Sequence, residues 1–177
     1  MRLTPPCPSI DFSTNDVYGK PIKLSDYKGK KVMLAFFRDA ACPFCNFRVY
    51  ELTQKYKNWH DKDFEIIAVF SSPADEVRRY VAKYPRPFRI ISDADLDLYS
   101  QYGVEHSVSA LFKAIFFKLP RIIKGMLKGG YPQPNPHVKL VPAEFLINAT
   151  GKVEHVWYGR DTSDHMPMEQ INNFINS

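Results

Sequence analysis

Two cysteines separated by two residues, Cys42 and Cys45, follow closely on a short apolar run in this chain of 177 residues. The run, residues 31–37, is continuous and rich in β-branched and aromatic side chains, which predicts a strand buried on both faces. Apolar positions then recur among polar ones up to His60, as in an amphipathic helix, and Pro43 suits the first helical turn. The sequence therefore predicts a buried strand that delivers two thiols to the N-terminus of a helix.

The rest of the chain continues an alternation of strands and helices. Ser72 precedes Pro73 and two acidic residues, which predicts a helix with Ser72 as its cap. The further predicted elements are a buried strand at 64–70, a helix at 72–84, a strand at 88–91, a helix at 95–102, a hairpin with strands at 144–147 and 152–157, and a helix at 167–175. This order predicts an α/β fold with a parallel portion and an antiparallel edge.

Composition and length predict one globular domain over residues 1–177. The hydrophobic fraction of 45% and the charged fraction of 24% are ordinary, which excludes a disordered tail, a collagen-like fibre and a disulfide-dense miniprotein. The apolar runs are far shorter than the ~18 residues that span a bilayer, and the proline-broken start shows no secretory signal. Three cysteines in such a chain indicate a reducing compartment, so we expect a cytoplasmic protein.

Reversible disulfide chemistry is the function that the cysteine spacing favours. At a helix N-terminus, unpaired amides and the macrodipole stabilise the thiolate of Cys42, which makes it the expected nucleophile. Cys45 lies one turn further along and is expected to resolve an adduct formed on Cys42. A zinc site, for which a second ligand pair is missing, and two inert buried cysteines are the alternatives. Cys7, between two prolines, is expected to be a bystander, and we expect no metal and no organic cofactor.

Three stretches of the chain resemble a known family. Residues 32–45, VMLAFFRDAACPFC, resemble the active-site segment of the thioredoxin superfamily. Residues 10–30 resemble the lead-in, and residues 141–153 the late hairpin, of its alkyl hydroperoxide reductase/thiol-specific antioxidant (AhpC/TSA) branch. The resemblance implies a thioredoxin-like three-layer α/β/α fold with a central mixed sheet. It also implies a peroxiredoxin-like antioxidant enzyme that reduces peroxides or protein disulfides and is itself reduced by a cellular dithiol donor such as a thioredoxin.

Two positions depart from the pattern of typical peroxiredoxins. Those proteins carry threonine or serine three residues before the reactive cysteine, where this chain has Asp39. A carboxylate there disfavours the Cys42 thiolate unless Arg38 or Arg48 compensates, and Asp39 itself is expected to relay a proton or to cap the helix. Peroxiredoxins also carry an arginine before the late strand, where this chain has Pro142. Thioredoxin-like reductases have a cis-proline facing the cysteines at that place, so the peptide bond before Pro142 is a candidate for the cis form.

A basic insertion interrupts the resemblance. Apolar positions at nearly helical spacing predict an amphipathic helical insertion over about 107–130, with a proline-rich connector over 131–142. Residues 106–143 contain no acidic residue and six basic ones: Lys113, Lys118, Arg121, Lys124, Lys128 and Lys139. The insertion could pack on the domain's own core, form a lid or a contact between copies of an oligomer, or attach to a membrane surface. We expect no nucleic-acid partner, because no nucleic-acid-binding motif accompanies the charge.

Three functions stay open on the sequence. The first is a peroxiredoxin-like oxidoreductase that uses Cys42 and Cys45 in a dithiol/disulfide cycle. The second is a thioredoxin-like thiol-disulfide oxidoreductase without significant peroxidase activity. The third is a binding module that keeps the redox fold as a scaffold and works through the basic helix.

Overall fold

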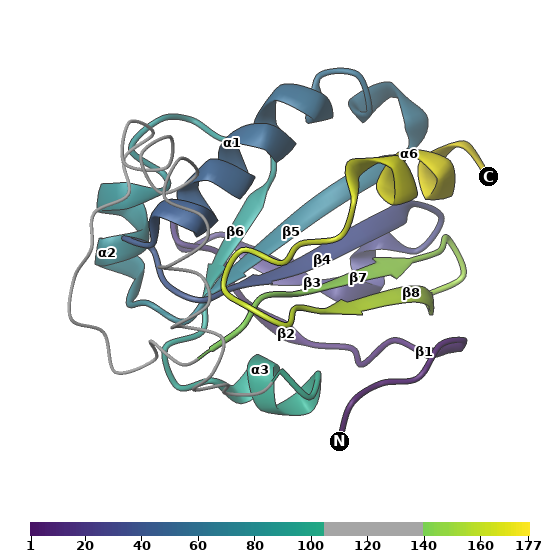
Figure 1. The fold of residues 1–177 in the computed structure, drawn as a ribbon, viewed down its shortest axis with the longest axis horizontal. Coiled ribbons are helices and arrows are strands. Elements are labelled where there is room, and N and C mark those ends of the chain that lie inside the picture. The colour runs from purple at the N-terminus through teal and green to yellow at the C-terminus, as the bar shows by residue number, and fades with distance from the viewer. Residues whose placement is uncertain (105–139) are drawn as a thin grey trace.

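A computed structural model describes residues 1–104 and 140–177 (Figure 1). The predicted helical insertion at 107–130, and the connector as far as residue 139, lie outside these residues. The helices and strands are β1 (Cys7–Pro8), β2 (Ser13–Asn15), β3 (Pro21–Lys23), η1 (Leu24–Tyr27), β4 (Lys31–Phe37), α1 (Pro43–Tyr56), η2 (His60–Lys62), β5 (Phe64–Phe70), α2 (Ala74–Tyr80), β6 (Arg89–Ser92), α3 (Asp97–Gln101), β7 (Ala143–Ile147), β8 (Lys152–Tyr158) and α6 (Met168–Asn176). The strands predicted at 31–37 and 64–70 have the predicted ends.

A mixed sheet forms the centre of the molecule, with the strand order β1-β8-β7-β4-β5-β6. β4 pairs in parallel with β5, and β5 with β6, whereas β7 and β8 are antiparallel to their neighbours. This arrangement confirms the predicted α/β fold with a parallel portion and an antiparallel edge. Phe37 and Phe70 are partners at the carboxyl ends of β4 and β5. The segments that follow these two strands therefore leave the sheet at the same edge.

Helices cover both faces of the sheet, because successive side chains of each strand point to opposite sides. Met33 and Phe37 of β4 belong to the core cluster that includes buried side chains of α1, α2 and α6. Leu34 and Phe36 belong to the other cluster, which includes side chains of α3. Figure 1 shows α1 and α6 over one face and α3 on the other side. Each of these buried apolar side chains contributes about 1.5–3 kcal/mol to the free energy of folding.

Two helix starts differ from the predictions. α2 has Pro73 at its N-cap without a side-chain cap, so the prediction that Ser72 caps it is wrong. The Ser72 hydroxyl instead accepts a hydrogen bond from the Ala40 amide at 3.0 Å, in the connection before α1. α3 begins at Asp97, two residues later than predicted. The Asp93 carboxylate accepts hydrogen bonds from amides in the first turn of α3, among them Leu98 N at 2.9 Å, and so fixes where the helix begins.

Candidate active site

The two predicted redox cysteines lie at the start of α1. Cys42 occupies the N-cap of this helix with extended backbone angles, and Pro43 stands at its first position. Cys45 follows within the first turn. A loop of residues 38–42 connects the end of β4 to this helix, so the central strand of the sheet sets the position of both thiols.

Buried side chains hold the backbone of this loop from within. Asn46 Nδ2 donates to the carbonyl oxygens of Ala40 at 2.6 Å and of Cys42 at 3.1 Å. Asp39 Oδ1 accepts from the Ala41 amide at 2.8 Å. Asp39 therefore caps an amide of the loop and not of the helix, since α1 has no side-chain cap bond. These hydrogen bonds, together with that from the Cys42 amide to the Asp39 carbonyl oxygen at 3.3 Å, hold the turn that carries Cys42.

Two further elements hold the same loop from the side of the sheet. The Ser71 hydroxyl, just after β5, donates to the Arg38 carbonyl oxygen. The Tyr99 hydroxyl of α3 contacts the carbonyl oxygens of Phe37 and, at 3.0 Å, of Val69. Tyr99 is fully buried, and this burial holds the pKa of its hydroxyl well above its ordinary value. It stays neutral and acts as a fixed link between α3 and the ends of β4 and β5.

The two thiols interact directly and differ in acidity. Cys42 is 2% exposed and Cys45 is 1% exposed. Burial raises the pKa of Cys42, but a hydrogen bond from the Cys45 thiol and the charge of Arg38 outweigh it and lower the pKa to about 7. Burial raises the pKa of Cys45 well above its ordinary value, and so does the hydrogen bond that it donates to Cys42. Near neutral pH a substantial fraction of Cys42 is therefore a thiolate, and it lies beside the protonated thiol of Cys45.

Arg38 is the cation beside Cys42. Its Nη2 lies 3.1 Å from Cys42 Sγ, and its Nε lies 3.3 Å from Asp39 Oδ2. Both residues are largely buried, so these charges interact with little screening by water. Burial raises the pKa of Asp39, although Arg38 and the Ala41 amide act in the opposite direction. The predicted effect of Asp39, which is to raise the pKa of Cys42, is present, and the charge of Arg38 acts more strongly in the opposite direction.

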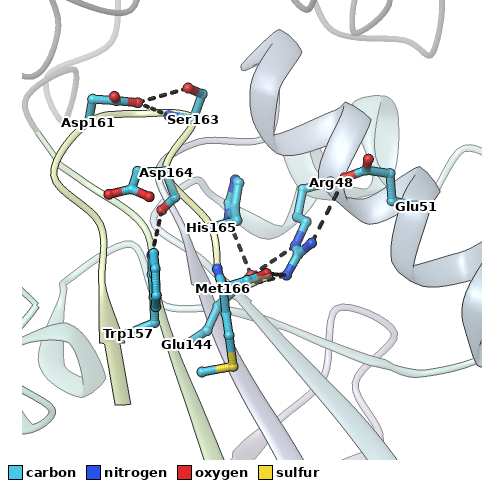
Figure 2. A network of polar contacts seen from close by, with 9 residues as sticks. All are labelled: Arg48, Glu51, Glu144, Trp157, Asp161, Ser163, Asp164, His165 and Met166. Carbon is cyan, nitrogen blue, oxygen red and sulfur yellow. Dashed lines mark hydrogen bonds and ion pairs between the residues drawn. The ribbon is translucent and has the colours of Figure 1, made fainter. Parts of the chain in front are cut away.

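Arg48, the other arginine considered for that role, is bound elsewhere. It extends from α1 to Glu144 of β7, with Nε 3.0 Å from Oε1 and Nη2 3.2 Å from Oε2 (Figure 2). Arg48 Nη2 also donates to the Met166 carbonyl oxygen at 2.7 Å. Burial raises the pKa of Glu144, but Arg48 and His165 outweigh it and lower the pKa to about 2. The Arg48 charge is therefore matched by Glu144 and not by Cys42.

The same carboxylate anchors the loop between β8 and α6. Glu144 Oε2 accepts from the Met166 amide at 2.6 Å, and Oε1 lies 3.1 Å from His165 Nδ1. Figure 2 shows Arg48 and His165 converging on Glu144 from different elements. This buried network ties α1, β7 and the segment before α6 together, and it keeps the helix that carries the thiols against the sheet.

The prediction of a cis bond before Pro142 is wrong. Within the described residues the cis peptide bond lies between Pro5 and Pro6, so the bond before Pro142 is trans. Pro142 is buried directly before β7, and its carbonyl oxygen accepts from the Gly159 amide at 2.8 Å. A trans bond leads straight into this pairing, and trans is the favoured form for prolines where no context selects cis.

Cys7 lies apart from the other two thiols. It pairs with Val153 at the edge of the sheet and packs against the core cluster on the α3 side, opposite the cluster that contains Cys42 and Cys45. In the part of the chain that the structure describes, no group of histidine, cysteine and acidic side chains could hold a metal ion. No helix among these residues is long and apolar enough to cross a membrane.

Several residues of the site were not predicted from the sequence. Glu144 carried a signal, since it is the single acidic residue of an otherwise apolar strand in the predicted hairpin. A charge in such a place requires a partner, which here is Arg48. Asn46, Ser71 and Tyr99 act through hydrogen bonds to backbone atoms of a loop. Their partners depend on the tertiary fold, so no pattern in the sequence marks them.

A dithiol at the N-terminus of a helix, delivered by the central strand of a mixed sheet, defines a thiol-dependent oxidoreductase of the thioredoxin fold. The model of the AhpC/TSA family matches residues 6–156, and the chain belongs to this family. It is 25% identical to peroxiredoxin Bcp of Escherichia coli over 154 residues, 87% of this chain and 85% of that protein. This assignment replaces the alternative of a non-enzymatic binding module.

Two further similar proteins represent the two expected activities, one a thiol-disulfide oxidoreductase and the other a peroxidoxin. The chain is 31% identical to the thiol-disulfide oxidoreductase ResA of Halalkalibacterium halodurans over 97 residues, 54% of each protein. The crystal structure of peroxidoxin BcpB from Mycobacterium tuberculosis superposes with a TM-score of 0.67, covering 97% of this chain and 93% of that one at 17% identity. The second likeness confirms the thioredoxin-like fold.

Proposed function

We propose that the chain is a dithiol peroxidase whose oxidising substrate is a small hydroperoxide. The observation that carries this proposal is the burial of Cys42, which is 2% exposed and has Arg38 Nη2 at 3.1 Å. A sulfur in this position admits a small oxidant more easily than a disulfide on the surface of another protein. The similarity to peroxiredoxin Bcp along most of the chain supports the same choice.

The cycle has three steps. The Cys42 thiolate attacks one oxygen of the O–O bond, which gives a sulfenic acid on Cys42 and releases an alcohol or water once the leaving oxygen gains a proton. The Cys45 thiol then attacks the Cys42 sulfur, forming the Cys42–Cys45 disulfide and releasing water. A dithiol donor finally reduces this disulfide through a mixed disulfide and is itself oxidised.

The reductant that fits this cycle is a thioredoxin-type dithiol. The donor must be replenished after each turnover, which a reducing compartment such as the cytoplasm provides. The proposed roles are nucleophile for Cys42, resolving thiol for Cys45 and counter-ion for Arg38.

A second candidate oxidant is a protein disulfide. Asp39 favours it, because typical peroxiredoxins carry a hydroxyl donor at this position, whereas the Asp39 carboxylate already accepts from Ala41 N and lies beside Arg38. The similarity to ResA points in the same direction over part of the chain.

Rate constants for two oxidants distinguish the candidates. Fully reduced protein is mixed in separate experiments with hydrogen peroxide and with a protein disulfide, and the loss of free thiols is timed. The proposal expects reaction with peroxide orders of magnitude faster than that of free cysteine, and slow reaction with the protein disulfide. The reverse order would assign the chain to disulfide exchange. The same measurements are made on Cys42→Ser, which should lose the rapid reaction. Cys7→Ser, which leaves the dithiol intact, is its matched control and should react like the wild-type chain.

A further inference from the structure

One guanidinium serves two acidic groups at the site. Arg38 contacts Cys42 through Nη2 at 3.1 Å and Asp39 through Nε at 3.3 Å. The exposed fraction of each of the three residues is at most 9%. Ionising both acids at once places two negative charges against one positive charge among buried, poorly solvated side chains. The thiolate and the carboxylate therefore compete for Arg38.

The other titratable groups near Arg38 do not change this competition between Cys42 and Asp39. The Cys45 thiol donates to Cys42 and, since burial and this hydrogen bond raise its pKa, it keeps its proton at neutral pH. Tyr99, packed from α3, is neutral for the same reason of burial and binds carbonyl oxygens. Arg48, further along α1, is paired with Glu144. Cys42 itself changes charge during the cycle, because it is negative as a thiolate and neutral in a disulfide.

We propose that Asp39 holds a proton while Cys42 is a thiolate and gives it up when Cys42 is oxidised, so that in the disulfide state the Arg38 guanidinium pairs with the Asp39 carboxylate instead of the thiolate. This inference rests on the dithiol cycle proposed above and adds to it the source of a proton. Asp39 is then the acid that protonates the group expelled from the oxidant. The upward effect of burial on the pKa of Asp39 is consistent with a proton held in the reduced state.

The balance closes over one turnover with a hydroperoxide. The Cys42 thiolate, the hydroperoxide and protonated Asp39 give the Cys42 sulfenic acid, an alcohol or water, and the Asp39 carboxylate. One S–O bond forms, the O–O bond breaks, and the carboxyl proton goes to the leaving oxygen. Cys45 then forms the disulfide and releases water. The donor dithiol brings two protons and two electrons, so that one proton returns to Asp39 and the other to Cys45.

Infrared difference spectra of the two redox states test this proposal directly. The full chain is oxidised with diamide, reduced with dithiothreitol, and compared near neutral pH. We expect a C=O band of a protonated carboxylic acid in the reduced state that is missing in the disulfide state. Labelling the side-chain carboxyl of aspartate with ¹³C should shift this band in the wild-type chain, a result that does not require any variant to fold.

Variants test whether the band comes from Asp39 and whether it depends on Arg38. Asp39→Asn should remove it, whereas Asp16→Asn, which removes a buried carboxylate bound to Arg89, should leave it in place. Arg38→Met should leave Asp39 protonated in both states, because the disulfide state then lacks the guanidinium, and the difference band should vanish. A reduced state with carboxylate bands alone, or a band that ignores the label or survives Asp39→Asn, would overturn the proposal.

The infrared experiment and the peroxidase experiment can fail independently of each other. Oxidation by diamide does not depend on the natural oxidant, so the band can be present in a chain that reacts poorly with peroxide. In that case the proton link stands and the peroxidase assignment fails. If diamide forms no Cys42–Cys45 disulfide, both the cycle and the proton link are wrong.

Discussion

Arg38 Nη2 lies 3.1 Å from Cys42 Sγ, across the loop that connects the central strand to the first long helix. The contact joins a guanidinium with a permanent charge to a thiol whose pKa is about 7. Burial alone would have made this cysteine a weaker acid. The thiolate thus owes its stability to two neighbours, Arg38 and the Cys45 thiol, and each can be removed separately.

Replacing Arg38 with methionine should raise the pKa of Cys42. An opposite charge at this distance lowers a thiol pKa by about 1–3, so its loss should reduce the thiolate fraction at pH 7, and with it the rate of oxidation of Cys42 by peroxide, by about 5- to 500-fold. The pH profile of the rate constant reports the pKa. The comparison variant is Arg160→Met, which removes an exposed arginine outside the site and should leave the profile unchanged. An unchanged midpoint in Arg38→Met would refute the role of this residue.

Cys45 should affect the acidity of Cys42 as a hydrogen-bond donor. Cys45→Ala removes the donor and should raise the pKa of Cys42, whereas Cys45→Ser keeps a hydroxyl donor in its place and should raise it less. Both variants lose the Cys45 thiol that is proposed to resolve the adduct, so the difference between them isolates the hydrogen bond. The measurement is the pH dependence of the first oxidation step, and equal midpoints for the two variants would argue against the hydrogen bond.

The wild-type rate of the first step should rise with pH and level off above about 7. Below this pH the Cys42 sulfur carries a proton and is a weak nucleophile, and above it the thiolate predominates. Stopped-flow measurement of peroxide consumption between pH 5 and 9 gives the profile. A rate that is flat across this range, or that climbs only above pH 8.5, would contradict the assigned acidity.

Glu144→Gln should destabilise the fold strongly, because it leaves the buried guanidinium of Arg48 without its matching charge. Breaking a buried pair in this way costs about 3–5 kcal/mol of unfolding free energy. Glu51→Gln is the matched control: it removes the other carboxylate near Arg48, which is 3.9 Å away and 29% exposed, and should cost about 0–1 kcal/mol. Urea unfolding measures the free energy of unfolding of both variants. Similar losses for the two would show that the buried Arg48–Glu144 pair stabilises the fold no more than the exposed contact of Glu51.

The same carboxylate should make stability sensitive to acid. The pKa of Glu144 is lowered from 4.5 to about 2 in the folded chain, so its contribution is complete above pH 4.5. This contribution, about 3 kcal/mol by linkage, should be lost as the pH falls from 4.5 toward 2. The unfolding free energy of the wild-type chain should therefore fall more steeply in this window than that of Glu144→Gln, and parallel slopes would count against the link.

The elements of the fold could be predicted because their patterns are local. The apolar runs at 31–37 and 64–70 are long enough to define buried strands, and the cysteine pair marked the start of α1. Ser72 was misassigned for a tertiary reason. Its hydroxyl could accept a hydrogen bond either from an amide of α2 or from the loop before α1, and in the structure it accepts from the Ala40 amide of that loop.

Of the residues around the cysteines, the sequence predicted only the charged ones that adjoin the cysteine motif. Asp39 and Arg38 adjoin the motif, and the structure places them against each other and against Cys42. The trans bond before Pro142 and the partner of Arg48 depend on contacts between segments far apart in the sequence, such as that of α1 with β7, which the local sequence does not specify.

The most direct test of the dithiol cycle is to map the oxidised sulfurs by mass spectrometry after reduced protein meets one equivalent of hydrogen peroxide. The account predicts a Cys42–Cys45 disulfide in the wild-type chain, a trapped sulfenic acid on Cys42 in Cys45→Ser, and no rapid oxidation in Cys42→Ser. Oxidation that begins on Cys45 or Cys7, or a Cys42→Ser variant that reacts as fast as the wild-type chain, would contradict it.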